Sequence, residues 1–156
     1  MGGSSLAPEV ITATAEVLQW HVVGMFAPGF VTGHLIKRMG ALPIMGLGVA
    51  INLACVGVAL SGQSVMHFLW AMALLGLGWN FLFTGSTSLV MRYYRPEERD
   101  RAEAAMNFCV FAVMAATSLA SGALATSGGW DWLNWGSLLA LILTAWALVG
   151  LARRGL

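Results

Sequence analysis

Five long runs of apolar residues, separated by short polar stretches, cover most of the chain. They lie at about 13–36, 43–61, 66–90, 104–127 and 133–152, and each is close to the roughly 20 residues that an α-helix needs to cross a bilayer. A chain inside lipid must satisfy its backbone hydrogen bonds internally, which favours helices here. The pattern therefore predicts an all-α fold, a polytopic membrane helical bundle of five transmembrane helices, in a single membrane domain over residues 1–156.

The first run is interrupted by Pro28 and Gly29. Pro28 lacks a backbone N–H and its ring collides with the preceding helical turn, so we expect a kink there. Membrane helices tolerate such a fault when neighbouring helices cover the carbonyl group that it frees.

Two of the runs carry small residues at helical spacing, which lets helices approach closely without a hydrophobic driving force. The stripes are Gly46, Ala50, Ala54 and Gly57 in the second run, and Ala112, Ala116 and Ala120 in the fourth. The second run also holds one amide, Asn52. An interhelical hydrogen bond is the ordinary role for such a side chain, and contact with a ligand is the alternative.

Glycine and polar residues recur on one face of the third run, at Gly76, Asn80, Thr84, Thr87 and Ser88. In the membrane, such a face must contact protein or a water-filled cavity, because lipid leaves polar groups unpaired. Threonine and serine hydroxyls can bond back to the preceding turn, whereas an asparagine amide does so less easily. Asn80 is therefore the stronger candidate for a functional contact.

Composition excludes an ordinary soluble domain, because 58% of the residues are apolar, only 10% are charged, and the mean hydropathy is +0.77. Cys55 and Cys109 both lie inside apolar runs, so the spacing indicates neither a disulfide framework nor a zinc site. The runs contain no catalytic triad, paired metal ligands, phosphate-binding loop or pair of carboxylates. We therefore expect no enzyme activity, no cofactor or metal, and no nucleic-acid partner.

The eight basic residues fall in three places, after the first, third and fifth runs, and the alternate connections carry none. They are Lys37, Arg38, Arg92, Arg95, Arg99, Arg101, Arg153 and Arg154. Basic residues in short loops stay on the cytoplasmic side of a membrane. The charge pattern therefore predicts a multi-pass protein of the cell membrane with its N-terminus outside and its C-terminus in the cytoplasm.

The segment at the end of the first run, Gly33 to Gly40, reads Gly-His-Leu-Ile-Lys-Arg-Met-Gly and predicts a tight cytoplasmic turn. It resembles the Gly-x-Leu-x-Asp-Arg-x-Gly loop of the major facilitator superfamily of secondary transporters, which joins the second and third helices of each six-helix half. Lys37 stands where that loop commonly has aspartate, and Arg38 matches its arginine. Pro96 and Arg99 resemble the Pro-x-x-Arg sequences found between the fourth and fifth helices of a half.

The resemblance implies that the five runs correspond to helices eight to twelve of a twelve-helix transporter, so that the chain is a fragment of its C-terminal half. It also implies transport by alternating access. An apolar cavity with a few amides suits a small organic solute. The third run would then line the central cavity. The candidates for the substrate pathway are Asn80, Thr84, Thr87, Gln19 and His21.

The partners expected from this resemblance are the lipid bilayer and either the missing transporter half or further copies of the chain in a homo-oligomer. A second hypothesis is a small membrane scaffold or assembly protein without transport activity. That class predicts small-residue stripes but no polar face at mid-membrane depth.

Overall fold

The structure is a computed structural model, and it describes residues 6–127 and 129–155. Within these residues the chain forms helices and no strand, which confirms the predicted all-α membrane bundle. The helices are α1 (Leu6–Phe26), α2 (Gly29–Met39), α3 (Ala41–Ser61), α4 (Val65–Val90), the short 3₁₀-helix η1 (Pro96–Glu98), α5 (Arg99–Ser127) and α6 (Gly129–Arg153).

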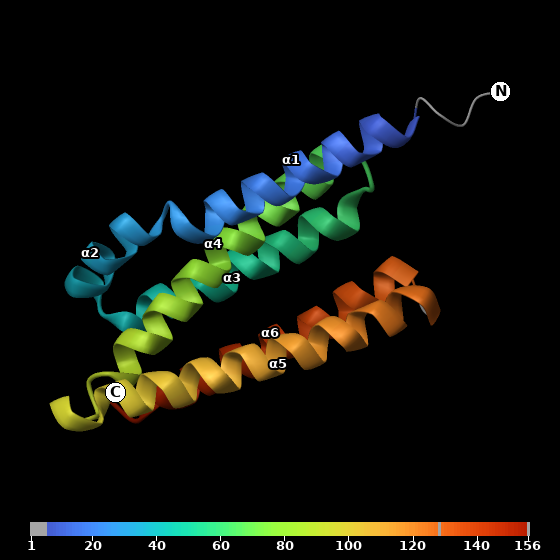
Figure 1. Cartoon of the computed structure of the whole chain (residues 1–156). Helices are drawn as coiled ribbons and strands as arrows, with labels where there is room; N and C mark the ends of the chain where they lie inside the picture. Colours follow the sequence, from blue (N-terminus) through green and yellow to red (C-terminus); the bar gives the residue numbers. More distant parts are fainter. Residues whose placement is uncertain (1–5, 128, 156) are drawn as a thin grey trace.

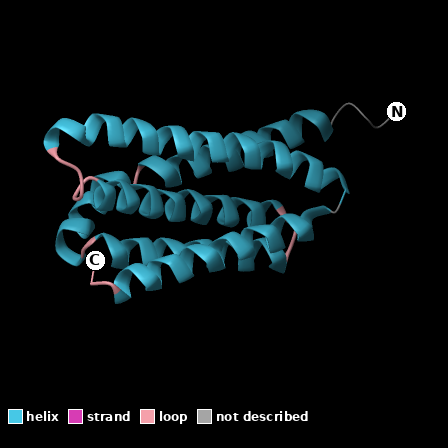
Figure 2. Ribbon diagram, turned by 90° about the horizontal axis from the view of Figure 1, so that it is seen from below, coloured by secondary structure: helices cyan, strands magenta, loops and turns pink. Residues whose placement is uncertain are grey.

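Helix α4 is the centre of the larger group of helices, because it packs along both α1 and α3. Helices α5 and α6 run side by side as a second group (Figure 1). The two groups are joined chiefly where α6 contacts α3, and α5 contacts little besides α6. Figure 2 shows the helices lying nearly parallel or antiparallel to one another, as in a membrane bundle.

Four segments of the described chain are long and apolar enough to cross a bilayer: Ala41–Ser61, Val65–Val90, Pro96–Ala123 and Trp132–Arg153. The remaining predicted span, 13–36, is divided between α1 and α2. The helix is interrupted by a turn at Ala27 and Pro28, so the kink expected at this proline is confirmed.

The predicted turn over Gly33–Gly40 is wrong in its extent. Gly33 lies inside α2, which continues to Met39, and the chain turns at Gly40. Gly40 has a φ of 90°, in the left-handed region that favours glycine, and its N–H donates to the Ile36 carbonyl oxygen at 2.9 Å. In the described structure, no atom beyond its neighbours and its own helix backbone lies within 4 Å of a Cβ built at Gly33, so this glycine mediates no close helix contact there.

All the basic segments lie at one end of the bundle. The end of α2, the connection from α4 through η1 to α5, and the end of α6 meet there, while α1 starts at the opposite end (Figure 1). Lys37 and Arg38 occupy the last turn of α2 and Arg153 the last turn of α6, where cations interact favourably with the helix dipole. The fold therefore brings the three basic segments, which are far apart in the sequence, to the same end of the bundle.

Close packing between α3 and α4 depends on glycine. A Cβ at Gly48 would lie 3.1 Å from both the Gly78 carbonyl oxygen and the Phe81 Cβ, so the two backbones approach tightly. A cluster of Ile36, Ala41, Ile44 and Phe81 fills the space where α2, α3 and α4 meet.

The predicted small-residue stripes lie elsewhere, on exposed faces of α3 and α5. Within the described residues, no atom lies within 4 Å of a Cβ built at Gly46 or Gly57. The apolar window of α5 has none of its residues buried. These faces are open to lipid or to further helices.

Candidate functional site

The break between α1 and α2 is the first feature of the candidate site. Pro28 has no N–H to offer the Gly24 carbonyl, so the helical hydrogen-bond ladder stops there. The ladder resumes when the N–H groups of Val31 and Thr32 donate to the Pro28 carbonyl oxygen, at 2.9 and 2.8 Å. Backbone groups at the break therefore need partners from another helix.

Asn80 of α4 supplies one such partner and also bonds a side chain beyond the break. Its Nδ2 donates to the Met25 carbonyl oxygen at 2.7 Å, and its Oδ1 accepts from the Thr32 hydroxyl at 2.6 Å. Met25 lies before the break and Thr32 after it, so one amide joins both segments to α4. Asn80 is 8% exposed and Thr32 is fully buried, which removes water as an alternative partner.

The Thr32 hydroxyl has a second acceptor within reach, the Pro28 carbonyl oxygen at 2.8 Å. A hydroxyl carries one hydrogen, so it serves either this carbonyl or Asn80 at a given moment. The contact with Asn80 is the shorter of the two. Thr32 is thus a donor shared between the break and α4.

His21 lies on the same contact between α1 and α4. Its Nδ1 is 2.9 Å from the Met72 carbonyl oxygen and donates to it when that nitrogen carries the proton. Two of the predicted pathway residues, His21 and Asn80, are therefore brought onto one interface by the fold.

The other predicted pathway residues are more scattered. Gln19 is exposed on α1. Thr84 and Thr87 are half-buried on α4, and the Thr87 hydroxyl donates to the Phe83 carbonyl oxygen at 2.8 Å, the local bond expected of a threonine in a helix.

The predicted turn and loop residues lie at the charged end of the bundle. Lys37 and Arg38 are exposed at the end of α2, next to Gly40. Pro96 begins η1 and Arg99 begins α5, and both are exposed. Proline suits the first position of a helical turn, because its missing N–H would have no partner there.

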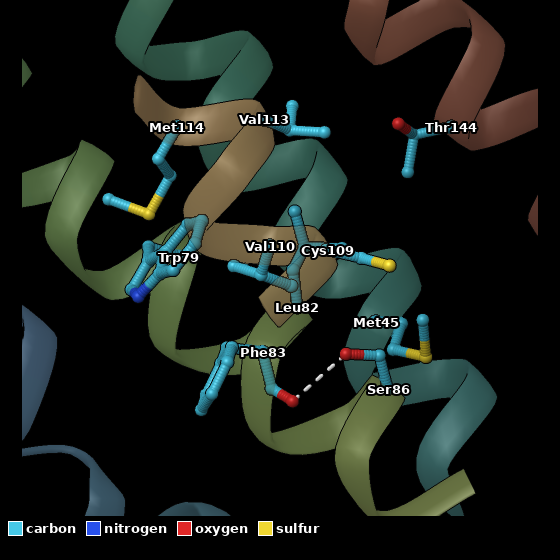
Figure 3. A pocket seen from close by; sticks show the side chains of 10 residues that line it. All are labelled: Met45, Trp79, Leu82, Phe83, Ser86, Cys109, Val110, Val113, Met114 and Thr144. Atoms are coloured by element: carbon cyan, nitrogen blue, oxygen red, sulfur yellow. Dashed lines mark hydrogen bonds between the residues drawn. The ribbon is translucent and has the colours of Figure 1, made fainter. Parts of the chain in front are cut away.

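A cavity of about 440 Å³ opens between α4 and α5, with single contributions from α3 and α6 (Figure 3). Trp79 and Phe83 form its wall on α4. Their rings are stacked with centroids 5.6 Å apart and planes 15° from parallel. Figure 3 shows the two rings one beside the other along the helix, with side chains of α5 next to them.

A second cavity of about 540 Å³ continues from the first, since Trp79, Leu82 and Thr144 line both. It differs in chemistry because amide and hydroxyl side chains line it, namely Asn52, Thr117, Asn134 and Ser137. Asn52 is only 6% exposed, and its Oδ1 has no hydrogen-bond partner in the described structure.

The sequence did not predict either cavity, because both form only where separate helices pack together. Trp79 and Phe83 are four residues apart, a spacing that puts them on one helix face, but aromatic residues at that spacing are also typical of a packed core. For Asn52, the absence of a partner for its oxygen appears only when α3 is packed against Gly78 of α4.

Comparison with known proteins identifies the class. The chain matches the model of the Major Facilitator Superfamily over residues 8–155. It therefore belongs to this family of membrane transporters, as the resemblance at Gly33–Gly40 and Pro96 predicts. The chain is thus a multi-pass membrane polypeptide of a transporter family and not an enzyme.

Among individual proteins, the chain is similar to the riboflavin transporter RfnT of Brucella anthropi, with 42% identity over 137 residues. That match covers 88% of this chain and 34% of the transporter. The uncharacterized MFS-type transporter YdeG of Bacillus subtilis is 29% identical over 134 residues, covering 84% of this chain and 31% of YdeG. The chain thus spans about a third of the length of these relatives. No solved structure matches it.

Proposed function

We propose that this chain is part of a secondary active transporter that moves a small organic solute across the cell membrane by alternating access. The observation that carries the proposal is the 42% identity to a protein named as a riboflavin transporter, which extends over 88% of the chain. The cavities beside α4 agree with it, because solute sites in such transporters lie between helices at mid-membrane depth.

The pathway residues divide into two roles in this proposal. Asn80 and His21 position the broken helix against α4. Thr84, Thr87 and Gln19 line neither cavity, so in this proposal they contribute polar groups elsewhere along the path. Broken helices recur at transporter sites because their interrupted backbone is tolerated where it is buried in protein or lines a cavity. The remaining partners are lipid and the other helices of the transporter, supplied by its other half or by further copies of the chain.

The test is solute uptake by bacterial cells that lack their own riboflavin uptake and express the complete reading frame containing this chain. Labelled riboflavin is the first solute to measure. We expect saturable movement that a protonophore or removal of the sodium gradient abolishes, because secondary transport draws on an ion gradient. Movement that persists without any ion gradient would exclude the secondary active mechanism.

The charged end of the bundle faces the cytoplasm in this proposal, which leads to a labelling prediction. With Cys55 and Cys109 replaced by serine, a cysteine at Gln63 should react with a membrane-impermeant maleimide in intact cells, and a cysteine at Arg95 should react only after permeabilisation. Both sites are exposed, so access to the reagent differs only by side of the membrane. Labelling of the Arg95 position in intact cells would reverse the orientation.

The isolated 156-residue chain should not transport. Helix α5 has no buried residue in its apolar window, and the cavities beside α4 are open in the chain as described. Reconstituted alone in liposomes, the chain should show no saturable riboflavin flux above that of empty liposomes. Saturable flux from the chain alone would instead support a transporter that assembles its pathway as a homo-oligomer.

A further inference from the structure

We infer that the two joined cavities beside α4 form one binding site for a flat heteroaromatic solute that carries a hydrogen-bonding side chain. The inference rests on the proposed transport function and adds the site and the substrate class to it. The aromatic wall of Trp79 and Phe83 takes the ring, and the cavity that contains Asn52 takes the polar side chain.

The aromatic wall suits a flat ring. Trp79 and Phe83 are nearly parallel, so a solute ring placed against the open side of either one continues the stack. Sulfur atoms of Met45, Cys109 and Met114 lie around the same cavity (Figure 3). Sulfur is polarizable and makes favourable contacts with aromatic rings. A purely aliphatic solute would use neither of these features.

The adjoining cavity suits polar groups. The Asn52 oxygen lacks a partner within the described structure, although its side chain is more than nine-tenths buried. Buried polar groups are normally paired, so an unpaired amide beside a cavity points to a donor that the described chain does not supply. A hydroxyl or N–H of a solute supplies such a donor after the amide turns toward it.

Size and depth agree with this assignment. Cavities of 440 and 540 Å³ fall in the range of about 300–1,000 Å³ that small-molecule sites occupy. Asn52, Trp79 and Thr144 each lie near the middle of their helix, α3, α4 and α6 respectively. The set therefore lies near the midplane of the bilayer, where a transported solute is held.

Binding to the purified complete transporter in detergent micelles tests the inference, with quenching of flavin fluorescence as the readout. The ligands are riboflavin, lumichrome, which has the ring without the polyol chain, and ribitol, which has the polyol without the ring. We expect riboflavin to bind, lumichrome to compete with it, and ribitol alone not to compete.

Trp79→Ala should raise the Kd for riboflavin roughly tenfold, because stacking on one aromatic side chain is typically worth about that factor. Trp79→Phe keeps an aromatic face and should stay within about threefold of the unmodified protein. Trp146→Ala is the matched control, since Trp146 is 79% exposed on α6 and lines neither cavity, and it should leave the Kd unchanged.

Asn52→Leu should weaken riboflavin binding several-fold while leaving lumichrome binding unchanged, because only riboflavin carries the polyol chain.

An unchanged Kd for riboflavin in Trp79→Ala would overturn the inference. The inference would also be overturned if both Trp79 variants fold poorly but their folded fraction binds riboflavin normally. Trp79 would then pack against protein in the complete transporter and would not contact the solute.

The inference and the proposed function can fail separately. A transporter that carries another solute but binds neither riboflavin nor lumichrome would overturn the inference and leave the transport function intact. A protein that binds riboflavin through Trp79 but does not move it across membranes would support the site and overturn the transport function.

Discussion

Asn80→Leu should insert into the membrane normally but destabilise the folded bundle and abolish most transport. Leucine removes the donor to the Met25 carbonyl and the acceptor for the Thr32 hydroxyl, leaving the break between α1 and α2 without its connection to α4. A buried group left unpaired costs about 1–3 kcal/mol, so we expect a loss of that size in the free energy of unfolding. Equilibrium unfolding in mixed micelles measures it, alongside uptake in cells.

Asn52→Leu is the matched control for the unfolding measurement, because it makes the same chemical change at an equally buried position. The Asn52 Oδ1 accepts no hydrogen bond within the described residues, so replacing it leaves no donor group without its acceptor. We expect the free energy of unfolding to stay the same or rise slightly. Equal destabilisation by the two variants would contradict the assigned role of Asn80, since the loss would then follow from the leucine alone.

Thr32→Val completes a double-mutant cycle with Asn80→Leu. If the 2.6 Å bond between Thr32 and Asn80 stabilises the fold, the double variant should lose about 1 kcal/mol less unfolding free energy than the two single variants combined. A coupling of this size lies within the range measured for hydrogen bonds in membrane proteins. Strict additivity would mean that the Thr32 hydroxyl serves the Pro28 carbonyl instead.

The sequence was sufficient to predict the fold class, the break and the clustering of charge. Long apolar runs between polar stretches predict helices because lipid permits few other structures, and Pro28 predicts a break because it has no N–H. These features depend on local chemistry. The partners of Asn80 do not, since Met25 and Thr32 are about fifty residues away along the chain and meet it only when α1 and α2 pack on α4.

The turn at Gly40 shows the limit of a motif. The glycine at each end of Gly33–Gly40 suggests a loop. The residues between them instead continue α2, because they give its last turns a buried apolar face and an exposed basic face. Of these two glycines, only Gly40 adopts a positive φ. In the same way, the glycines that allow close helix contact, Gly24 and Gly76, look no different in sequence from the exposed Gly46 and Gly57.

Gly76→Ala should separate α1 from α4 and thereby remove most transport. A Cβ at Gly76 would lie 3.0 Å from the Met25 nitrogen and 3.1 Å from the Gly24 carbonyl carbon, and it would collide with the His21 carbonyl oxygen. These neighbours are backbone atoms of a helix and cannot turn aside as a side chain would. Overpacking typically costs about 1–3 kcal/mol, and we expect the upper end of that range because a whole helix must shift.

The same shift should break the contacts that lie on either side of Gly76. Moving α1 away from α4 lengthens the 2.9 Å contact from His21 to the Met72 carbonyl and the 2.7 Å bond from Asn80 to Met25. Gly57→Ala is the control, because the described structure has no atom within 4 Å of a Cβ there and alanine favours a helix by up to about 1 kcal/mol over glycine. We therefore expect Gly57→Ala to retain or increase stability, with normal uptake. Normal stability and uptake in Gly76→Ala would mean that α1 does not pack on α4 through this glycine, and the positioning role of Asn80 and His21 would then lose its structural basis.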